Sequence, residues 1–135
     1  MARLRHIALR AKDMEESRRF YEMLGFKYIG HRPGGKGLDL TDGTLNMTII
    51  QYEGEKRQAL EEGMEFIHFG LIVDELEGLY KTLQERRATL LRDDVKKRDE
   101  IDQEQPPARS FKVADPDGNV VDITCAKDEW RGVTL

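Results

Sequence analysis

The sequence has little of several features that would place it in a specialised class of protein. Only one of its 135 residues is a cysteine, Cys125, which excludes an internal disulfide and a zinc site built from cysteines. No run of about 18 apolar residues occurs, and the N-terminal segment has no apolar stretch of signal-peptide length. We therefore expect a cytoplasmic protein with no membrane span.

Neither sign of charge dominates the chain. Its 22 basic and 26 acidic residues give a net charge of −4. The basic clusters at residues 86–87 and 96–98 are interrupted by acidic residues, which is typical of a solvated face and not of a nucleic-acid-binding stripe. We expect no nucleic-acid partner, and a globular chain that buries its core without a disulfide or structural metal.

Periodicity predicts the elements of the first half. Residues 4–11 alternate as a strand does, and Asp13 with Glu16 three positions later has the spacing of a helix capping box. Apolar residues at helical spacing predict a helix over 14–24, which ends before Gly25. Strands are expected at 26–29, 38–40 and 45–52, the last two joined by a hairpin turn at Asp42-Gly43.

The second half repeats this order. A strand at 65–73 is followed by Asp74 as the expected helix cap and by an amphipathic helix from about residue 76. Strands follow at 110–114 and 119–124 around an Asp-Pro-Asp-Gly turn. His6 and His68 lie 62 residues apart, and Asp13 and Asp74 lie 61 apart, which indicates a duplicated βαβββ unit.

The predicted fold is α+β: a single domain over 1–135, with two βαβββ modules that form an open, cup-shaped sheet. Its predicted parts are module one at 1–54, a linker at 55–64, module two at 65–126 and a tail at 127–135. The polar segment 91–108, which contains paired prolines, is expected to form a long excursion beside the second sheet.

Two histidines and an aspartate stand at positions where strands can bring them together. His6 and His68 are central in the first strand of each half, and Asp122 lies in an apolar closing strand. Two neutral imidazoles and one carboxylate form a facial metal site that leaves coordination positions open. Hydrogen-bonded strand histidines and a backbone-capping Asp122 are the alternative, but the duplicated placement of the histidines favours the metal site.

Weaker candidates for substrate contacts lie elsewhere in the chain. His31 follows the second predicted strand and can act as an acid or base at the mouth of the cup, or simply be an exposed loop residue. Tyr52 and Arg109 can line the cup as hydrogen-bond donors to a substrate oxyanion, or lie on the surface. No catalytic residue is assigned from the sequence.

The chain resembles the vicinal oxygen chelate (VOC) superfamily, which includes glyoxalase I, bleomycin- and fosfomycin-resistance proteins and extradiol dioxygenases. The segments LRHIALRAKDMEESRRFYEMLGF at 4–26, IHFGLIVDELEGLYKTL at 67–83 and ADPDGNVVDIT at 114–124 carry the resemblance. It implies that His6, His68 and Asp122 bind a divalent metal, that a small substrate chelates this metal through neighbouring oxygens, and that the chain forms a homodimer.

Two positions depart from the pattern of the family. Asp122 stands where a Glu is more usual, and the fourth ligand of glyoxalase I-like members, also a Glu, is replaced by Thr48 or Met47 depending on the alignment. We therefore expect an extradiol-dioxygenase-type or glyoxalase-like enzyme, with Fe(II) or Mn(II) favoured and Zn(II) or Ni(II) possible. The alternatives are a metal-free drug-binding protein of the bleomycin-resistance kind and a glyoxalase I-type lyase or epimerase.

Overall fold

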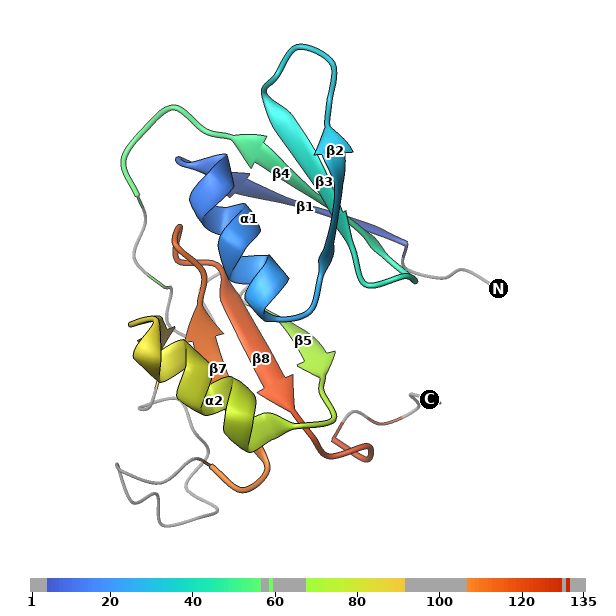
Figure 1. Cartoon of the computed structure of the whole chain (residues 1–135), viewed down its shortest axis with the longest axis vertical. Coiled ribbons are helices and arrows are strands. Elements are labelled where there is room, and N and C mark those ends of the chain that lie inside the picture. The colour runs from blue at the N-terminus through green and yellow to red at the C-terminus, as the bar shows by residue number, and fades with distance from the viewer. Residues whose placement is uncertain (1–4, 57–58, 60–67, 92–106, 130, 132–135) are drawn as a thin grey trace. The chain divides into compact units, whose positions relative to one another are not determined.

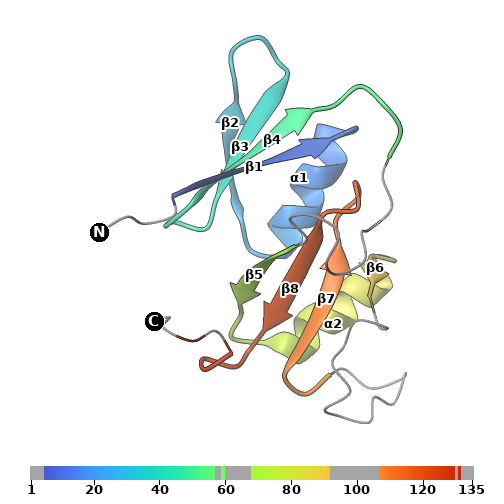
Figure 2. The same ribbon diagram turned by 180° about the vertical axis from the view of Figure 1, so that it is seen from behind.

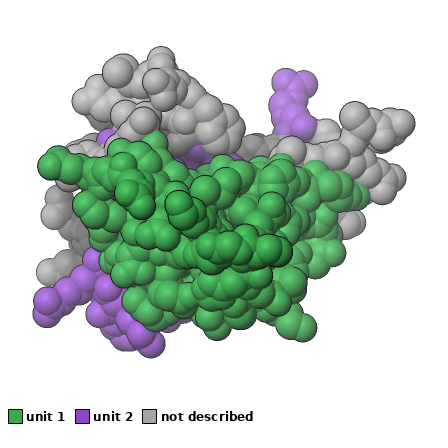
Figure 3. Space-filling model, turned by 90° about the horizontal axis from the view of Figure 1, so that it is seen from above, with its two compact units in different colours: residues 1–58, 116–118 green, residues 59–115, 119–135 purple. Residues whose placement is uncertain are grey.

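The computed structural model describes residues 5–56, 59, 68–91, 107–129 and 131. The chain divides into two compact units, coloured separately in Figure 3. Unit 1 comprises residues 1–58 together with 116–118, and unit 2 comprises 59–115 together with 119–135. No helix in the described part of the chain is long and apolar enough to span a bilayer.

Unit 1 contains one helix and a four-stranded open sheet (Figure 1). Along the chain its elements are β1 (His6–Ala11), α1 (Met14–Met23), β2 (Lys27–His31), β3 (Gly37–Thr41) and β4 (Asn46–Gln51). The strand order is β1-β4-β3-β2, with β1 parallel to β4 and the other neighbours antiparallel.

Unit 2 repeats this plan (Figure 2). Its elements are β5 (His68–Ile72), α2 (Leu76–Glu85), β6 (Thr89–Leu90), β7 (Ser110–Ala114) and β8 (Val120–Thr124). The order is β5-β8-β7-β6, and again the first and last strands are the parallel pair. The predicted α+β fold with two βαβββ modules is confirmed; the two-residue strand β6 was not expected from the sequence.

Each sheet has one apolar face that packs against its helix. In unit 1 the fully buried residues Leu38, Leu40, Met47 and Ile49 form this face, and α1 lies against β3 and β4. In unit 2, Tyr80 of α2 meets Phe111 of β7 edge to face, with ring centroids 5.1 Å apart. Because strand side chains alternate, the residues between these apolar ones lie on the opposite, open face of each sheet.

Of the two predicted N-terminal helix caps, one is confirmed and one is wrong. Asp13 caps α1 as expected, and its Oδ1 accepts hydrogen bonds from the backbone N–H groups of Glu15 and Glu16 at 3.0 Å. The cap of α2 is Glu75 and not Asp74: the Glu75 carboxylate accepts from the Gly78 N–H at 2.8 Å. Gly78 permits this approach because a Cβ there would clash with the carboxylate.

With Glu75 as the cap of α2, the helix caps and the histidines of the two modules are separated by the same number of residues. Asp13 and Glu75 lie 62 residues apart, the same spacing as His6 and His68. Most of the predicted linker at 55–64 and of the excursion at 91–108 lies outside the described residues.

The Asp-Pro-Asp-Gly turn contributes a buried carboxylate to unit 1. Asp117 is 0 % exposed, and its Oδ1 accepts a hydrogen bond from the Lys12 N–H at 2.9 Å. Its Oδ2 lies 3.5 Å from the hydroxyl of Ser17, which is also fully buried. Asp117 therefore satisfies a backbone donor just before α1, 105 residues away in sequence.

Replacing Asp117 with alanine should lower the free energy of unfolding by about 1–3 kcal/mol, because it leaves the Lys12 N–H without its acceptor. Asp117→Asn is the matched control, since its amide oxygen can still accept from that N–H. Urea unfolding monitored by circular dichroism measures both. Equal losses for the two variants, or no loss for Asp117→Ala, would contradict this role.

Candidate functional site

The open face of the unit 1 sheet is polar around the pair of parallel strands. The register of β1 and β4 places His6 beside Asn46 and Ala8 beside Thr48. On the next strand, β3, Asp39 pairs in register with Thr48. Four residues of different chemistry, His6, Asn46, Thr48 and Asp39, thus occupy one face on three adjacent strands.

A hydrogen bond fixes the protonation pattern of neutral His6. The ring Nδ1 lies 2.7 Å from the Asn46 side-chain oxygen Oδ1. Since an amide oxygen only accepts, Nδ1 carries the proton and donates it. The lone pair of neutral His6 is then on Nε2, where it is available to a metal ion.

Unit 2 brings together the other two predicted ligands. His68 Nε2 and Asp122 Oδ2 lie 3.9 Å apart, which is beyond hydrogen-bond distance. Metal ions bond nitrogen and oxygen ligands at about 2.1 Å, so a modest approach of the two side chains would let one ion bond both atoms. In addition, His68 Nδ1 is buried and has no hydrogen-bond partner among the described residues. The gap between Nε2 and Oδ2 is what fits a metal ion, whereas the unpartnered Nδ1 is the ring nitrogen that would not face that ion.

The neighbours of Asp122 differ on its two sides. The parallel register of β5 and β8 pairs Asp122 with Gly70, which has no side chain. On its other side, the antiparallel register of β7 and β8 pairs Asp122 with Lys112, a residue only 8 % exposed. Sequence reasoning missed Lys112; its signal is a lysine between the apolar residues Phe111 and Val113 of a strand.

The two units carry different residues at equivalent positions. Ala8 and Gly70 lie 62 residues apart, the spacing of the duplication, and they pair with Thr48 and Asp122 respectively. Thr48 is therefore the unit 1 counterpart of Asp122. Met47, the other position considered for a fourth ligand, is fully buried on the helix-covered face.

Thr48 forms hydrogen bonds with both members of the ion pair between Arg32 and Asp39. Its hydroxyl donates to Asp39 Oδ1 at 2.7 Å and accepts from Arg32 Nη2 at 2.8 Å. Arg32 Nε lies 3.1 Å from both carboxylate oxygens of Asp39. Burial raises the pKa of Asp39, but hydrogen bonds from Arg32, Thr48 and Asn46 and the charge of Arg32 outweigh it, so the pKa is lowered from its usual value.

Comparison with known proteins assigns the family. The model of the Glyoxalase/Bleomycin resistance protein/Dioxygenase superfamily matches residues 3–123. This chain belongs to that superfamily. No curated protein matches it.

Solved structures of this superfamily and of related chains share the fold. A glyoxalase/dioxygenase from Nostoc punctiforme is 19% identical, with 93% of this chain and 92% of that chain covered and a TM-score of 0.71. The fosfomycin resistance protein FosX from Listeria monocytogenes is 19% identical over 96% and 94% of the chains, with a TM-score of 0.67. An integron cassette protein from the V. cholerae mobile metagenome is 24% identical over 92% and 94%, with a TM-score of 0.62.

The weaker candidates lie in other surroundings. His31 Nε2 is 3.0 Å from Glu15 Oε1 of α1, and its Nδ1 contacts the Tyr28 hydroxyl, so His31 lies toward the helix and not beside His6. The Arg10 guanidinium lies 5.5 Å from the centroid of the Tyr52 ring. These contacts give His31 and Tyr52 local structural partners.

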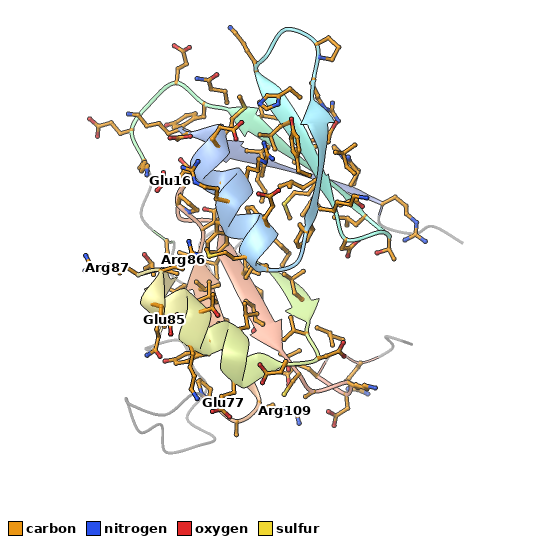
Figure 4. All side chains as sticks on the ribbon, in the orientation of Figure 1. Glu16, Glu77, Glu85, Arg86, Arg87 and Arg109 are labelled. Atoms are coloured by element: carbon orange, nitrogen blue, oxygen red, sulfur yellow. The ribbon has the colours of Figure 1, made fainter. Side chains whose placement is uncertain are left out.

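Arg109, which is labelled in Figure 4, forms ion pairs with two acidic residues of the segment after β8. Its Nη2 lies 2.8 Å from Asp128 Oδ1, and its Nε lies 2.8 Å from Glu129 Oε2. Hydrogen bonds to Glu129 and Asp128 raise the pKa of Arg109. This charge is therefore compensated within unit 2.

The predicted ligand set of this superfamily member is divided between the units. His6 belongs to unit 1, whereas His68 and Asp122 belong to unit 2. Within neither unit do the described residues gather three or more His, Cys, Asp or Glu side chains into a possible metal site.

Proposed function

We propose that this chain is a metal-dependent enzyme that binds a small substrate through two neighbouring oxygen atoms. His6, His68 and Asp122 hold one divalent ion. The observation that carries the proposal is the pair of His68 and Asp122, whose facing atoms are 3.9 Å apart across a gap that suits an ion and not a hydrogen bond. The free Nε2 of His6 supports it from the other module.

The donor set indicates which ions fit. Two imidazoles and a hard carboxylate favour Fe(II) or Mn(II), and also accept Zn(II) or Ni(II). When bound, such an ion supplies Lewis-acid stabilisation of a substrate anion or, as Fe(II), electrons for dioxygen. The Asp122 side chain is one methylene shorter than the more usual Glu and would hold such an ion closer to β8.

The position of Thr48 separates two kinds of reaction. A glyoxalase I-type isomerisation needs a base that removes a proton next to a carbonyl. Thr48 occupies the counterpart of Asp122 and carries no group that titrates near neutral pH. The chain is therefore proposed as an extradiol-dioxygenase-type enzyme, in which only three protein ligands leave room for a bidentate substrate and dioxygen.

A metal-free protein that sequesters a drug is the alternative of a different class. It would need no ligand at His6, His68 or Asp122. The polar open face, with a histidine prepared as a lone-pair donor, favours the metal-dependent enzyme. Metal analysis separates the two.

Metal content is the first prediction from this site. His6→Ala, His68→Ala and Asp122→Ala should each lower metal affinity by more than about tenfold, because no spare protein ligand replaces the lost one. Elemental analysis of protein loaded with Fe(II) or Mn(II) and then dialysed measures it. His31→Ala is the matched control and should keep the metal. Full metal stoichiometry in all three ligand variants would contradict the assignment.

Substrate choice is the second prediction. Protein loaded with Ni(II) or Zn(II) should show negligible isomerisation of the glutathione hemithioacetal of methylglyoxal, since Thr48 offers no base. Catechols added to anaerobic Fe(II)-loaded protein should perturb its absorption spectrum by chelating the ion. Robust glyoxalase turnover would overturn the proposal for an extradiol-type site.

We also propose that the chain acts as a homodimer. A site built from one copy of each module can form within one chain or between the modules of two chains, and open sheets leave edge strands that another copy can meet. Light scattering at micromolar concentration should give the mass of two chains. A monomer under these conditions would contradict the dimer.

A further inference from the structure

We infer that Asn46 is a positioning residue for His6: it holds the imidazole in the tautomer whose Nε2 can bind a metal. The inference rests on the proposed function, in which His6 is a ligand. It starts from the 2.7 Å contact between His6 Nδ1 and Asn46 Oδ1. Histidines that bind metals commonly donate their other ring N–H to an oxygen, which fixes the ring and its tautomer.

Asn46 is placed for this role by the strand register. It pairs directly with His6 across the parallel strands β1 and β4, so the two side chains leave the sheet on the same face. The contact does not depend on a flexible loop. A small rotation of the Asn46 amide is enough to make or lose it.

A hydrogen bond that the Asn46 amide donates to the Asp39 carboxylate limits that rotation. Thr48, only 1 % exposed, lies beside them with its hydroxyl 3.2 Å from Asn46 Oδ1, but it donates its one proton to Asp39. Thr48 is itself fixed by Arg32 and Asp39 at 2.8 and 2.7 Å. The position that holds a carboxylate in unit 2 therefore holds, in unit 1, a hydroxyl that shares the Asp39 carboxylate with Asn46, the partner of His6.

The other module shows what happens without this acceptor. In the equivalent register His68 pairs with Val120, whose side chain cannot accept a hydrogen bond. His68 Nδ1 is accordingly buried with no hydrogen-bond partner among the described residues. Of the two histidines, only His6 has its tautomer fixed by the residue beside it, and this difference can be measured in the metal-free protein.

The test combines tautomer and metal affinity. Long-range proton–nitrogen spectra of the metal-free protein, at a pH where its histidines are neutral, should show His6 protonated at Nδ1. Asn46→Ala should shift His6 away from this tautomer and weaken Mn(II) binding, measured by chelator competition, by about 10–100-fold. Asn46→Asp keeps an acceptor oxygen for the ring, although it removes the amide donor to Asp39, so it should retain the Nδ1-protonated form and bind Mn(II) more tightly than Asn46→Ala.

Controls separate this inference from a general loss of structure. The spectrum of His68 and the thermal midpoint should be nearly unchanged in both variants. If Asn46→Ala does not fold, Asn46→Ser serves, because its shorter side chain cannot reach the ring.

Two results would overturn different parts of this account, the role of Asn46 or the proposed function. An unchanged His6 tautomer or unchanged Mn(II) affinity in Asn46→Ala, with affinity lost in His6→Ala, would overturn the role of Asn46. Full Mn(II) affinity in His6→Ala would instead overturn the proposed function, because His6 would not be a ligand.

Discussion

The parallel pairing of the first and last strands in each module is the constraint on which the rest of the structure depends. It places β4 beside β1 and β8 beside β5, so residues far apart in sequence meet in register on one face. In unit 1 it brings Asn46 to His6, and in unit 2 it brings Asp122 near His68. The apolar residues between them face the helix, so the core and the polar face come from the same alternation.

Duplication of this scaffold has not duplicated its chemistry. Each unit has a cross-strand polar pair at the equivalent place on its open face: Asp39 with Thr48 in one, and Lys112 with Asp122 in the other. In unit 1 the carboxylate of Asp39 is bound by Arg32 and the Thr48 hydroxyl. In unit 2 the carboxylate lies across a gap from His68. The open face of the first unit thus carries a histidine hydrogen-bonded to Asn46, and that of the second carries a histidine near a carboxylate.

Local patterns in the sequence predict the helices and strands well, but they predict poorly which distant residues those elements bring into contact. Alternation and helical spacing identify the strand Ser110–Ala114 and the helix Met14–Met23, because both signals lie within a few residues. The register of a sheet depends on contacts between strands far apart in sequence. The hydrogen bonds between Asn46 and His6 and between Thr48 and Asp39 were therefore not predicted. The same reason explains Asp117, whose hydrogen-bond partner lies 105 residues away. The cap Glu75 was missed because Asp74 beside it is the more usual capping residue.

The central claim is that one ion is held by a histidine from each module and a carboxylate. X-ray absorption spectroscopy at the edge of bound Fe(II) or Mn(II) tests it most directly, because scattering from imidazole rings counts the bound histidines. The account predicts two imidazoles in the natural protein, one in His6→Ala and two with altered oxygen scattering in Asp122→Asn. A spectrum with no histidine, or one that His6→Ala leaves unchanged, would contradict it.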